Sequence, residues 1–192
     1  MKKNTILLNS VLSAMFMAIG LVLPFLTGQI PQIGNMLLPM HIPVLLCGFI
    51  CGSQYGFIVG CSLPLLRSFL FSAPVLYPTA IAMAFELATY GFLSGYLFKK
   101  SRWQCVRSLY RCLIITMIAG RIVWGIAQTF LLLGGAESFS LTAFISGAVL
   151  NAIPGIALQL ILIPALMLAL NKTHLVHFKK HNMKKDKTCE AE

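Results

Sequence analysis

Three charged side chains lie within long apolar stretches of this sequence: Arg67, Glu86 and Arg121. An ionised group at the centre of a bilayer costs roughly 2.5–3.5 kcal/mol on insertion scales, so such residues are usually functional or paired. Two interpretations are open. Either Glu86 forms a structural ion pair with Arg67 or Arg121, or the three residues line a polar pocket that opens to the outside and binds a small molecule.

The chemistry of such a pocket depends on which partner Glu86 takes. Two arginines face one glutamate, and the spare guanidinium favours an anionic ligand group, such as a carboxylate gripped by an arginine fork. A neutral heteroaromatic molecule is equally compatible with Glu86 and its aromatic neighbours. A carboxylate within the membrane also suits proton coupling, which would make Glu86 the proton site of an ion-driven carrier.

His41 and Asn151 share the outer half of the membrane with Arg67 and Glu86, whereas Arg121 is expected nearer the middle, and other polar and aromatic residues share a helix face with Glu86 or Arg121. Tyr90 lies one turn after Glu86, and Trp124 and Gln128 follow Arg121 at spacings of three and seven. Aromatic rings beside hydrogen-bonding groups suit a flat or amphiphilic ligand. For Tyr77 and Trp103, an anchoring role at the membrane interface is the alternative. The expected substrate-binding residues at this stage are His41, Arg67, Tyr77, Glu86, Tyr90, Arg121, Trp124 and Asn151.

Apolar segments of membrane-spanning length must position these groups. The chain has 192 residues, of which 58% are hydrophobic and only 10% are charged, whereas soluble domains average about 25% charged residues. No Lys, Arg, Asp or Glu occurs between Lys3 and Arg67, and a span needs roughly 20 residues. We therefore predict an all-α integral membrane protein whose six transmembrane helices lie at about 5–24, 40–51, 55–71, 79–98, 112–133 and 141–170.

The basic residues predict how these spans are oriented. The net charge is +10, and Lys and Arg gather at the N-terminus, in the linker 99–111 and in the tail 171–192. Cytoplasmic loops concentrate Lys and Arg, so both chain ends are expected inside, with residues 1–170 as the transmembrane domain and 171–192 as a disordered basic tail. This pattern favours contact with the lipid bilayer over nucleic acid.

Small residues at spacing four mark the first apolar segment. Ser10, Ala14 and Ala18 share one helix stripe, and such stripes let another helix approach closely in lipid. Docking of a partner protein and packing within the chain's own bundle are both compatible with the spacing.

Several motifs are absent from the sequence. It contains no GxxxxGK[ST] loop for ATP phosphates, no HExxH and no GxSxG. The six cysteines form no CxxC pair and no metal-ligand pattern. We therefore expect neither an enzyme nor a cofactor or metal site, and uphill transport would take its energy from a partner or an ion gradient.

Three segments and the predicted topology resemble one family. The residues GNMLLPMHIP at 34–43, ELATYG at 86–91 and AGRIV at 119–123, with the stripe at Ala14 and Ala18, are similar to the substrate-binding S components of energy-coupling factor (ECF) vitamin transporters. The resemblance implies a six-helix protein of a bacterial plasma membrane that binds a vitamin or precursor near the outer face. It adds Asn35, in the first outer loop, to the expected substrate site.

The resemblance also implies partners. An S component docks through its first helix onto a transmembrane coupling subunit joined to two ATPase subunits, which use the ATP, so Ser10, Ala14 and Ala18 would form the docking face. Pantothenate-like, pyridoxine-like and benzimidazole-like cargoes remain open. Two alternatives of other classes are an autonomous ion-coupled carrier that uses Glu86, and a membrane scaffold or enzyme subunit without a ligand.

Overall fold

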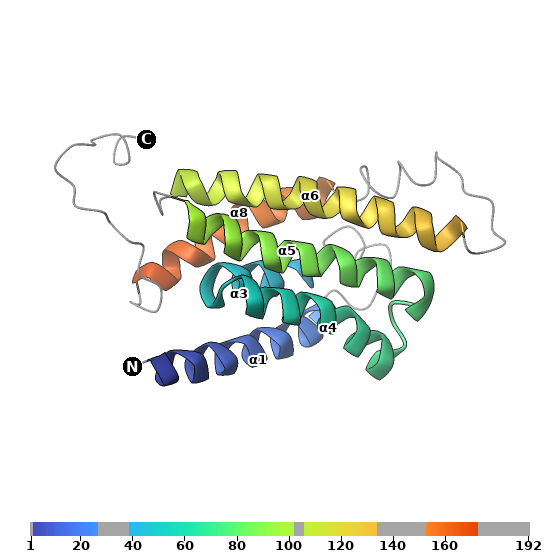
Figure 1. Cartoon of the computed structure of the whole chain (residues 1–192), viewed down its shortest axis with the longest axis horizontal. Helices are drawn as coiled ribbons and strands as arrows, with labels where there is room; N and C mark the ends of the chain where they lie inside the picture. Colours follow the sequence, from blue (N-terminus) through green and yellow to red (C-terminus); the bar gives the residue numbers. More distant parts are fainter. Residues whose placement is uncertain (1, 27–38, 102–105, 134–152, 173–192) are drawn as a thin grey trace.

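A computed structural model describes residues 2–26, 39–101, 106–133 and 153–172. These residues form α1 (Lys2–Leu26), α3 (His41–Cys51), α4 (Ser53–Phe71), the short irregular turn η1 (Leu76–Ala80), α5 (Ile81–Lys100), α6 (Val106–Leu133) and α8 (Ile153–Lys172). No strand occurs among them. Successive α-helices run in alternating directions along one long axis (Figure 1).

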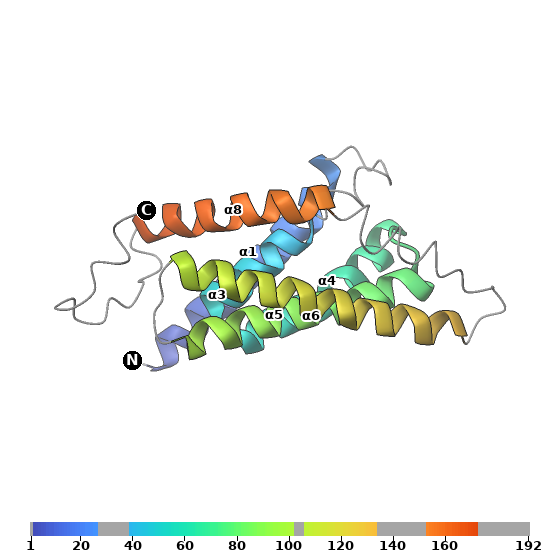
Figure 2. The ribbon, with the colours of Figure 1, turned by 90° about the horizontal axis from the view of Figure 1, so that it is seen from above.

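Two helices, α3 and α5, form the centre of the bundle. α5 packs against α3, α4 and α6, and α3 also contacts α1, α4 and α8. Every residue of α3 from His41 to Phe49 is buried, because this short helix is surrounded by the others. Seen from above, α8 runs along the side of the bundle opposite α5 (Figure 2), where it contacts α3 and α6.

Glycines set the close contact of α3, α4 and α5. A Cβ atom added at Gly56 would lie 2.4 Å from the carbonyl oxygen of Gly91, and one added at Gly91 would lie 2.0 Å from the carbonyl oxygen of Gly56. At Gly60 the added atom would lie 2.2 Å from the carbonyl oxygen of Leu87. Helices in lipid associate through packing, and small residues allow this backbone approach. The backbone of α5, which carries Glu86, is thereby fixed against α4.

The turn between α3 and α4 is a single residue. Gly52 has φ +100°, a conformation that glycine adopts without steric cost. Its N–H donates to the carbonyl of Gly48 at 3.1 Å, and its own carbonyl accepts from the N–H of Gly56 at 3.0 Å. The turn is therefore confined to Gly52, and α4 begins at Ser53, two residues before the span predicted at 55–71.

The outside of the bundle is apolar. Exposed large hydrophobic side chains occur on α1, α4, α5, α6 and α8, and Phe69 is 88% exposed. Within the described part of the chain, three segments are long and apolar enough to cross a membrane, namely Ile6–Phe25, Leu76–Lys100 and Val106–Leu131, while His41–Cys51 and Gly155–Leu170 are apolar but shorter. These features are those of an all-helical membrane protein. The count of six spans and their orientation stay predictions.

The predicted linker at 99–111 was wrong in its extent. Lys99 and Lys100 form the last turn of α5, and α6 begins at Val106 and includes Arg107 and Arg111. Lys and Arg are good helix formers, and lysines in a last turn interact favourably with the helix dipole, so these basic residues do not end the helices. Residues 141–152 of the sixth predicted span and residues 173–192 of the tail lie outside the described residues.

Candidate functional site

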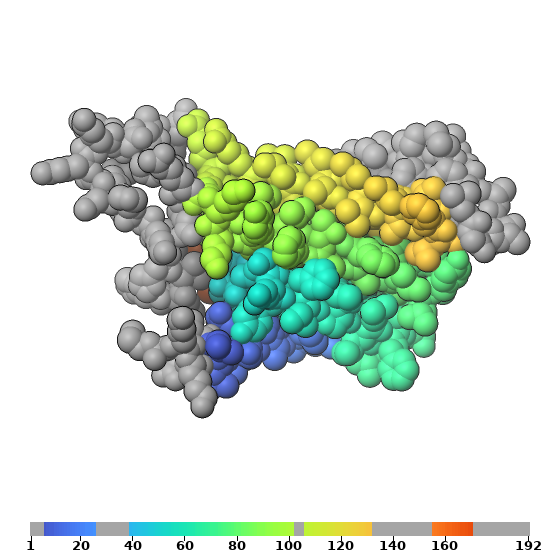
Figure 3. Space-filling model, viewed as in Figure 1, coloured from blue at the N-terminus to red at the C-terminus, as the bar shows by residue number. Residues whose placement is uncertain are grey.

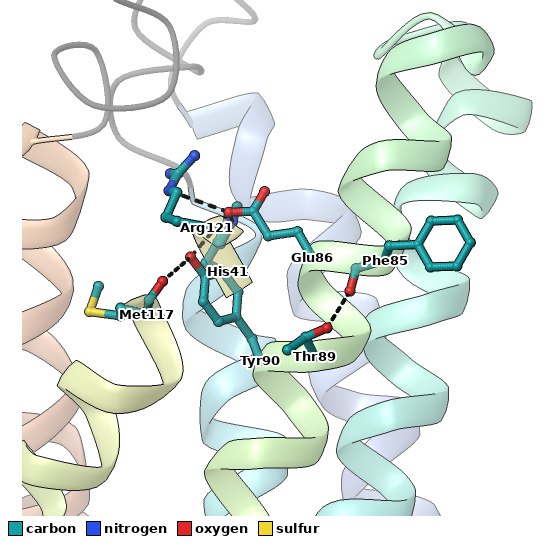
Figure 4. Close-up of polar contacts among 7 residues, drawn as sticks. All are labelled: His41, Phe85, Glu86, Thr89, Tyr90, Met117 and Arg121. Atoms are coloured by element: carbon teal, nitrogen blue, oxygen red, sulfur yellow. Dashed lines mark hydrogen bonds and ion pairs between the residues drawn. The ribbon is translucent and has the colours of Figure 1, made fainter. Parts of the chain in front are cut away.

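Glu86 lies in a buried cluster of polar side chains from three helices (Figure 4). Its Oε1 atom accepts a hydrogen bond from the hydroxyl of Tyr90 at 3.0 Å. The same oxygen lies 3.5 Å from Nε2 of His41 and 3.4 Å from Nε of Arg121. These four residues come from α3, α5 and α6, and we call them the Glu86 cluster. Of the two ion pairs considered for Glu86, the structure contains the one with Arg121.

Tyr90 links the carboxylate of Glu86 to α3 and α6. Its hydroxyl also lies 3.4 Å from the carbonyl oxygen of Met117, so it bridges α5 and α6. Its ring meets the imidazole of His41 edge-on, with centroids 5.1 Å apart and an interplanar angle of 62°. A Cβ atom at Gly120 would lie 2.3 Å from the Tyr90 ring. The residue before Arg121 must therefore be small for Tyr90 to occupy this place.

Several polar atoms of the cluster are buried without a hydrogen bond. They are Nδ1 and Nε2 of His41 and Nε and Nη2 of Arg121, so the contacts of these two residues with Glu86 are electrostatic and lack hydrogen-bond geometry. His41 and Glu86 are each 1% exposed. Buried polar groups are nearly always hydrogen-bonded, so exceptions mark candidate functional positions. In Figure 4 the guanidinium group and the second oxygen of Glu86 point away from Tyr90.

Arg67 makes a separate set of contacts, away from Glu86. Its Nε donates to the carbonyl of Ala73 at 3.0 Å, and its Nη1 donates to the carbonyl of Leu21 at 3.3 Å. Its guanidinium carbon lies 5.6 Å from the ring centroid of Phe25. The side chain thus ties the end of α1 to the segment after α4. No ion pair of Arg67 with Glu86 occurs in the structure.

The other expected substrate residues are placed less centrally. Tyr77 is half exposed, and its hydroxyl donates to the carbonyl of Leu131, which joins η1 to the end of α6. Trp124 is partly buried on α6, and Oε1 of Gln128 is buried without a hydrogen bond. Asn35 and Asn151 lie outside the described residues.

Two buried polar side chains were missed in the sequence. Thr116 on α6 is fully buried, and Gln159 on α8 is 1% exposed. Oγ1 of Thr116 and Nε2 of Gln159 have no hydrogen-bond partner. A signal existed for Gln159, because it is the only amide side chain in the apolar run 155–170. Thr116 gave none, since a threonine inside an apolar helix commonly bonds its own backbone.

The small-residue stripe lies on the outside of α1. Ser10, Ala14 and Ala18 are all exposed, whereas Ser13, Phe16 and Gly20 are buried. A Cβ atom at Gly20 would lie 2.6 Å from Leu63, so this second face packs against α4. In the space-filling view α1 forms one edge of the molecule (Figure 3). Its exposed stripe faces away from the rest of the bundle.

Comparison with known proteins gives a family. No curated protein and no solved structure matches the chain. A family model described as "ECF transporter, substrate-specific component" matches residues 8–167, a range that includes all of the Glu86 cluster and the stripe on α1. The chain therefore belongs to the ECF transporter substrate-specific components, the membrane subunits that determine which substrate these transporters take.

Proposed function

We propose that this chain binds a vitamin or vitamin precursor at the Glu86 cluster, near the outer face, and delivers it inward when docked to an ATP-driven ECF module. The observation that carries the proposal is the cluster itself. It places a carboxylate, an imidazole, a phenol and a guanidinium together in an apolar bundle, with buried nitrogens that make no hydrogen bond among the described residues. Ligand sites have this composition of apolar walls and a few convergent polar groups.

The exposed stripe of α1 supports the docking part of the proposal. Ser10, Ala14 and Ala18 are small and exposed, and small residues allow another helix to pack closely. The partner is a transmembrane coupling subunit that carries two ATPase subunits. These subunits would hydrolyse the ATP, in line with a sequence that has no phosphate-binding loop.

We also propose six spans with both chain ends in the cytoplasm of a bacterium, in its plasma membrane. The alternating directions of the described α-helices support an even number of crossings (Figure 1). The basic ends of α5 and α6 support the cytoplasmic side for that end of the bundle.

The proposal is tested by ligand screening of the purified protein in detergent. A ligand that binds only the folded state, at 100 times its dissociation constant, stabilises it by about 2.7 kcal/mol. One vitamin or precursor should raise the unfolding temperature clearly. Glu86→Gln and Arg121→Ala should lose most of that shift.

The control for this screen is Thr89→Val. Thr89 neighbours Tyr90 in sequence, but its hydroxyl donates to the carbonyl of Phe85 and is not part of the cluster (Figure 4). This variant should keep the shift. Equal shifts in the wild type, Glu86→Gln and Arg121→Ala would remove the Glu86 cluster from the binding site.

A second candidate is an autonomous carrier that uses Glu86 as a proton site. The observation in its favour is that a carboxylate 1% exposed lies within a candidate span. It predicts uptake by proteoliposomes that contain this chain alone and are driven by a pH gradient. The subunit proposal predicts no uphill uptake until the coupling and ATPase subunits and ATP are added.

A further inference from the structure

We infer that the cargo binds the Glu86 cluster as a molecule without net charge, which presents a hydrogen-bond donor and an acceptor side by side. Cyclic amides, ureides and hydroxylated heteroaromatics have such an edge. The inference rests on the proposed function and narrows its substrate class. It excludes a cargo that is held in this cluster by a carboxylate.

The first argument is the charge of the cluster. Glu86 and Arg121 contribute opposite charges at 3.4 Å. His41 is buried beside them, and neither of its ring nitrogens has a hydrogen bond among the described residues. The carboxylate and the guanidinium of the cluster thus balance each other. A bound anion would add an uncompensated charge to a region whose carboxylate is 1% exposed, and buried charges without a partner are costly.

The second argument is that Arg67, the arginine not paired with Glu86, is not available to bind a ligand carboxylate. The sequence left one guanidinium free to grip a carboxylate. In the structure Arg67 instead donates to two backbone carbonyls, at 3.0 and 3.3 Å, and lies against the ring of Phe25. Because Arg121 is already opposite Glu86, no cation of the Glu86 cluster is left without a counter-charge.

The third argument is the kind of atom that lacks a partner. Nε and Nη2 of Arg121 are donors, and His41 adds two ring nitrogens without a hydrogen bond among the described residues. Glu86 is only an acceptor, and its Oε1 already receives all of its described contacts. A ligand edge that accepts from Arg121 and donates to the second carboxylate oxygen of Glu86 would bind both residues. Such an edge needs adjacent acceptor and donor atoms and no net charge.

The experiment uses pairs of probes that share a skeleton and differ in charge. Nicotinamide with nicotinate, pantothenol with pantothenate, and biotinamide with biotin are such pairs. Binding of each compound to the purified full chain in detergent is measured by thermal shift and calorimetry. We expect the wild type to bind an uncharged member at least roughly 10-fold more tightly than its carboxylate partner, since burying an unpaired charge weakens binding.

Charge variants give the decisive comparison. Glu86→Gln raises the charge of the cluster by one and keeps the size of the side chain. In this variant the preference should shift towards the carboxylate member by roughly 10-fold or more. Arg67→Gln, which changes a charge outside the cluster, should leave the preference of any probe unchanged.

Three results would overturn the inference. One is tighter binding of a carboxylate member by the wild type, and another is loss of that binding in Arg67→Gln. The third is an infrared spectrum in which the carboxyl band removed by Glu86→Gln belongs to the protonated acid, since the cluster would then be positive. A tightly bound carboxylate probe would refute this inference but leave the proposed function standing. Absence of ATP-dependent uptake in the complete complex would instead refute the proposed function.

Discussion

At the scale of single residues, Glu86 is the organising group of the site. One of its oxygens accepts a hydrogen bond from the hydroxyl of Tyr90 and lies near both His41 and Arg121. It is also the only acidic residue among those that the structure describes. A lone carboxylate that faces polar side chains from α3, α5 and α6 couples the packing of these helices to the chemistry of the site.

Tyr90→Phe tests this coupling. The variant keeps the edge-on contact with His41 and removes the hydroxyl that reaches Glu86 and the carbonyl of Met117. A hydrogen bond to a charged group contributes about 1.5–3 kcal/mol, so the free energy of unfolding should fall by about that amount. Urea or thermal unfolding in detergent measures it.

Tyr96→Phe is the matched control, because Tyr96 is 45% exposed on the same helix. It should change the free energy of unfolding by less than about 0.5 kcal/mol, as surface substitutions generally do. Equal effects of the two substitutions would show that the hydroxyl of Tyr90 contributes nothing specific.

At the scale of elements, the glycine contact between α4 and α5 sets where the site lies. The backbone of Gly56 meets that of Gly91 with no space for a Cβ atom on either residue. Glu86 lies five residues before Gly91 on α5, so separating these helices would also move the carboxylate away from His41 on α3.

Gly91→Ala should therefore both destabilise the fold and weaken ligand binding. The added atom would meet backbone, which cannot move aside as a side chain can, and overpacking typically costs about 1–3 kcal/mol. Thermal unfolding should show a lowered midpoint. Ser62→Ala, a change of an outward-facing α4 residue whose hydroxyl bonds its own helix at Ile58, serves as control. A wild-type midpoint for Gly91→Ala would mean that α4 and α5 are less closely packed than described.

The first helix is the element that should contact the partner. Ala14→Leu adds bulk to the exposed stripe and leaves the face that packs on α3 and α4 intact. We expect co-purification with the coupling subunit to be lost, while the unfolding temperature and ligand binding stay at wild-type values.

The control for Ala14→Leu is Ala157→Leu, the same change at an exposed alanine of α8. It should leave complex formation unchanged. If Ala14→Leu instead impairs ligand binding and spares the complex, the stripe serves the chain's own packing.

At the scale of the whole molecule, the alternating helices predict which ends share a side of the membrane. Ser72, after α4, and Ser101, after α5, lie at opposite ends of the bundle. In a cysteine-free background, Ser72→Cys should react with an impermeant maleimide added to intact cells. Ser101→Cys should react only after the cells are permeabilised. Reversed labelling would show that the orientation is opposite to the proposed one. Equal labelling of Ser72→Cys and Ser101→Cys would contradict an odd number of crossings between these two positions.

The sequence by itself determined the features that follow from the order of residues along a single helix. Long apolar runs with few charged residues indicated the helices, because an ionised side chain in lipid is costly. The spacing of Ser10, Ala14 and Ala18 defined a stripe, since residues four apart share a helix face. The resemblance at 34–43, 86–91 and 119–123 led to the family that the comparison shows.

The contacts between residues of different helices were decided only by the tertiary structure, because they depend on which helices are neighbours. Position along a span placed Arg67 and Glu86 in the outer half of the membrane and Arg121 nearer its middle, and it left either arginine open as the partner of Glu86. The packing of α5 against α3 and α6 brings His41 and Arg121 to Glu86, and Arg67 turns to backbone carbonyls instead. The outward direction of the α1 stripe was decided in the same way, because Gly20 and Phe16 on another face pack into the bundle. Contacts between helices depend on rotation and close packing, neither of which a pattern within one helix encodes.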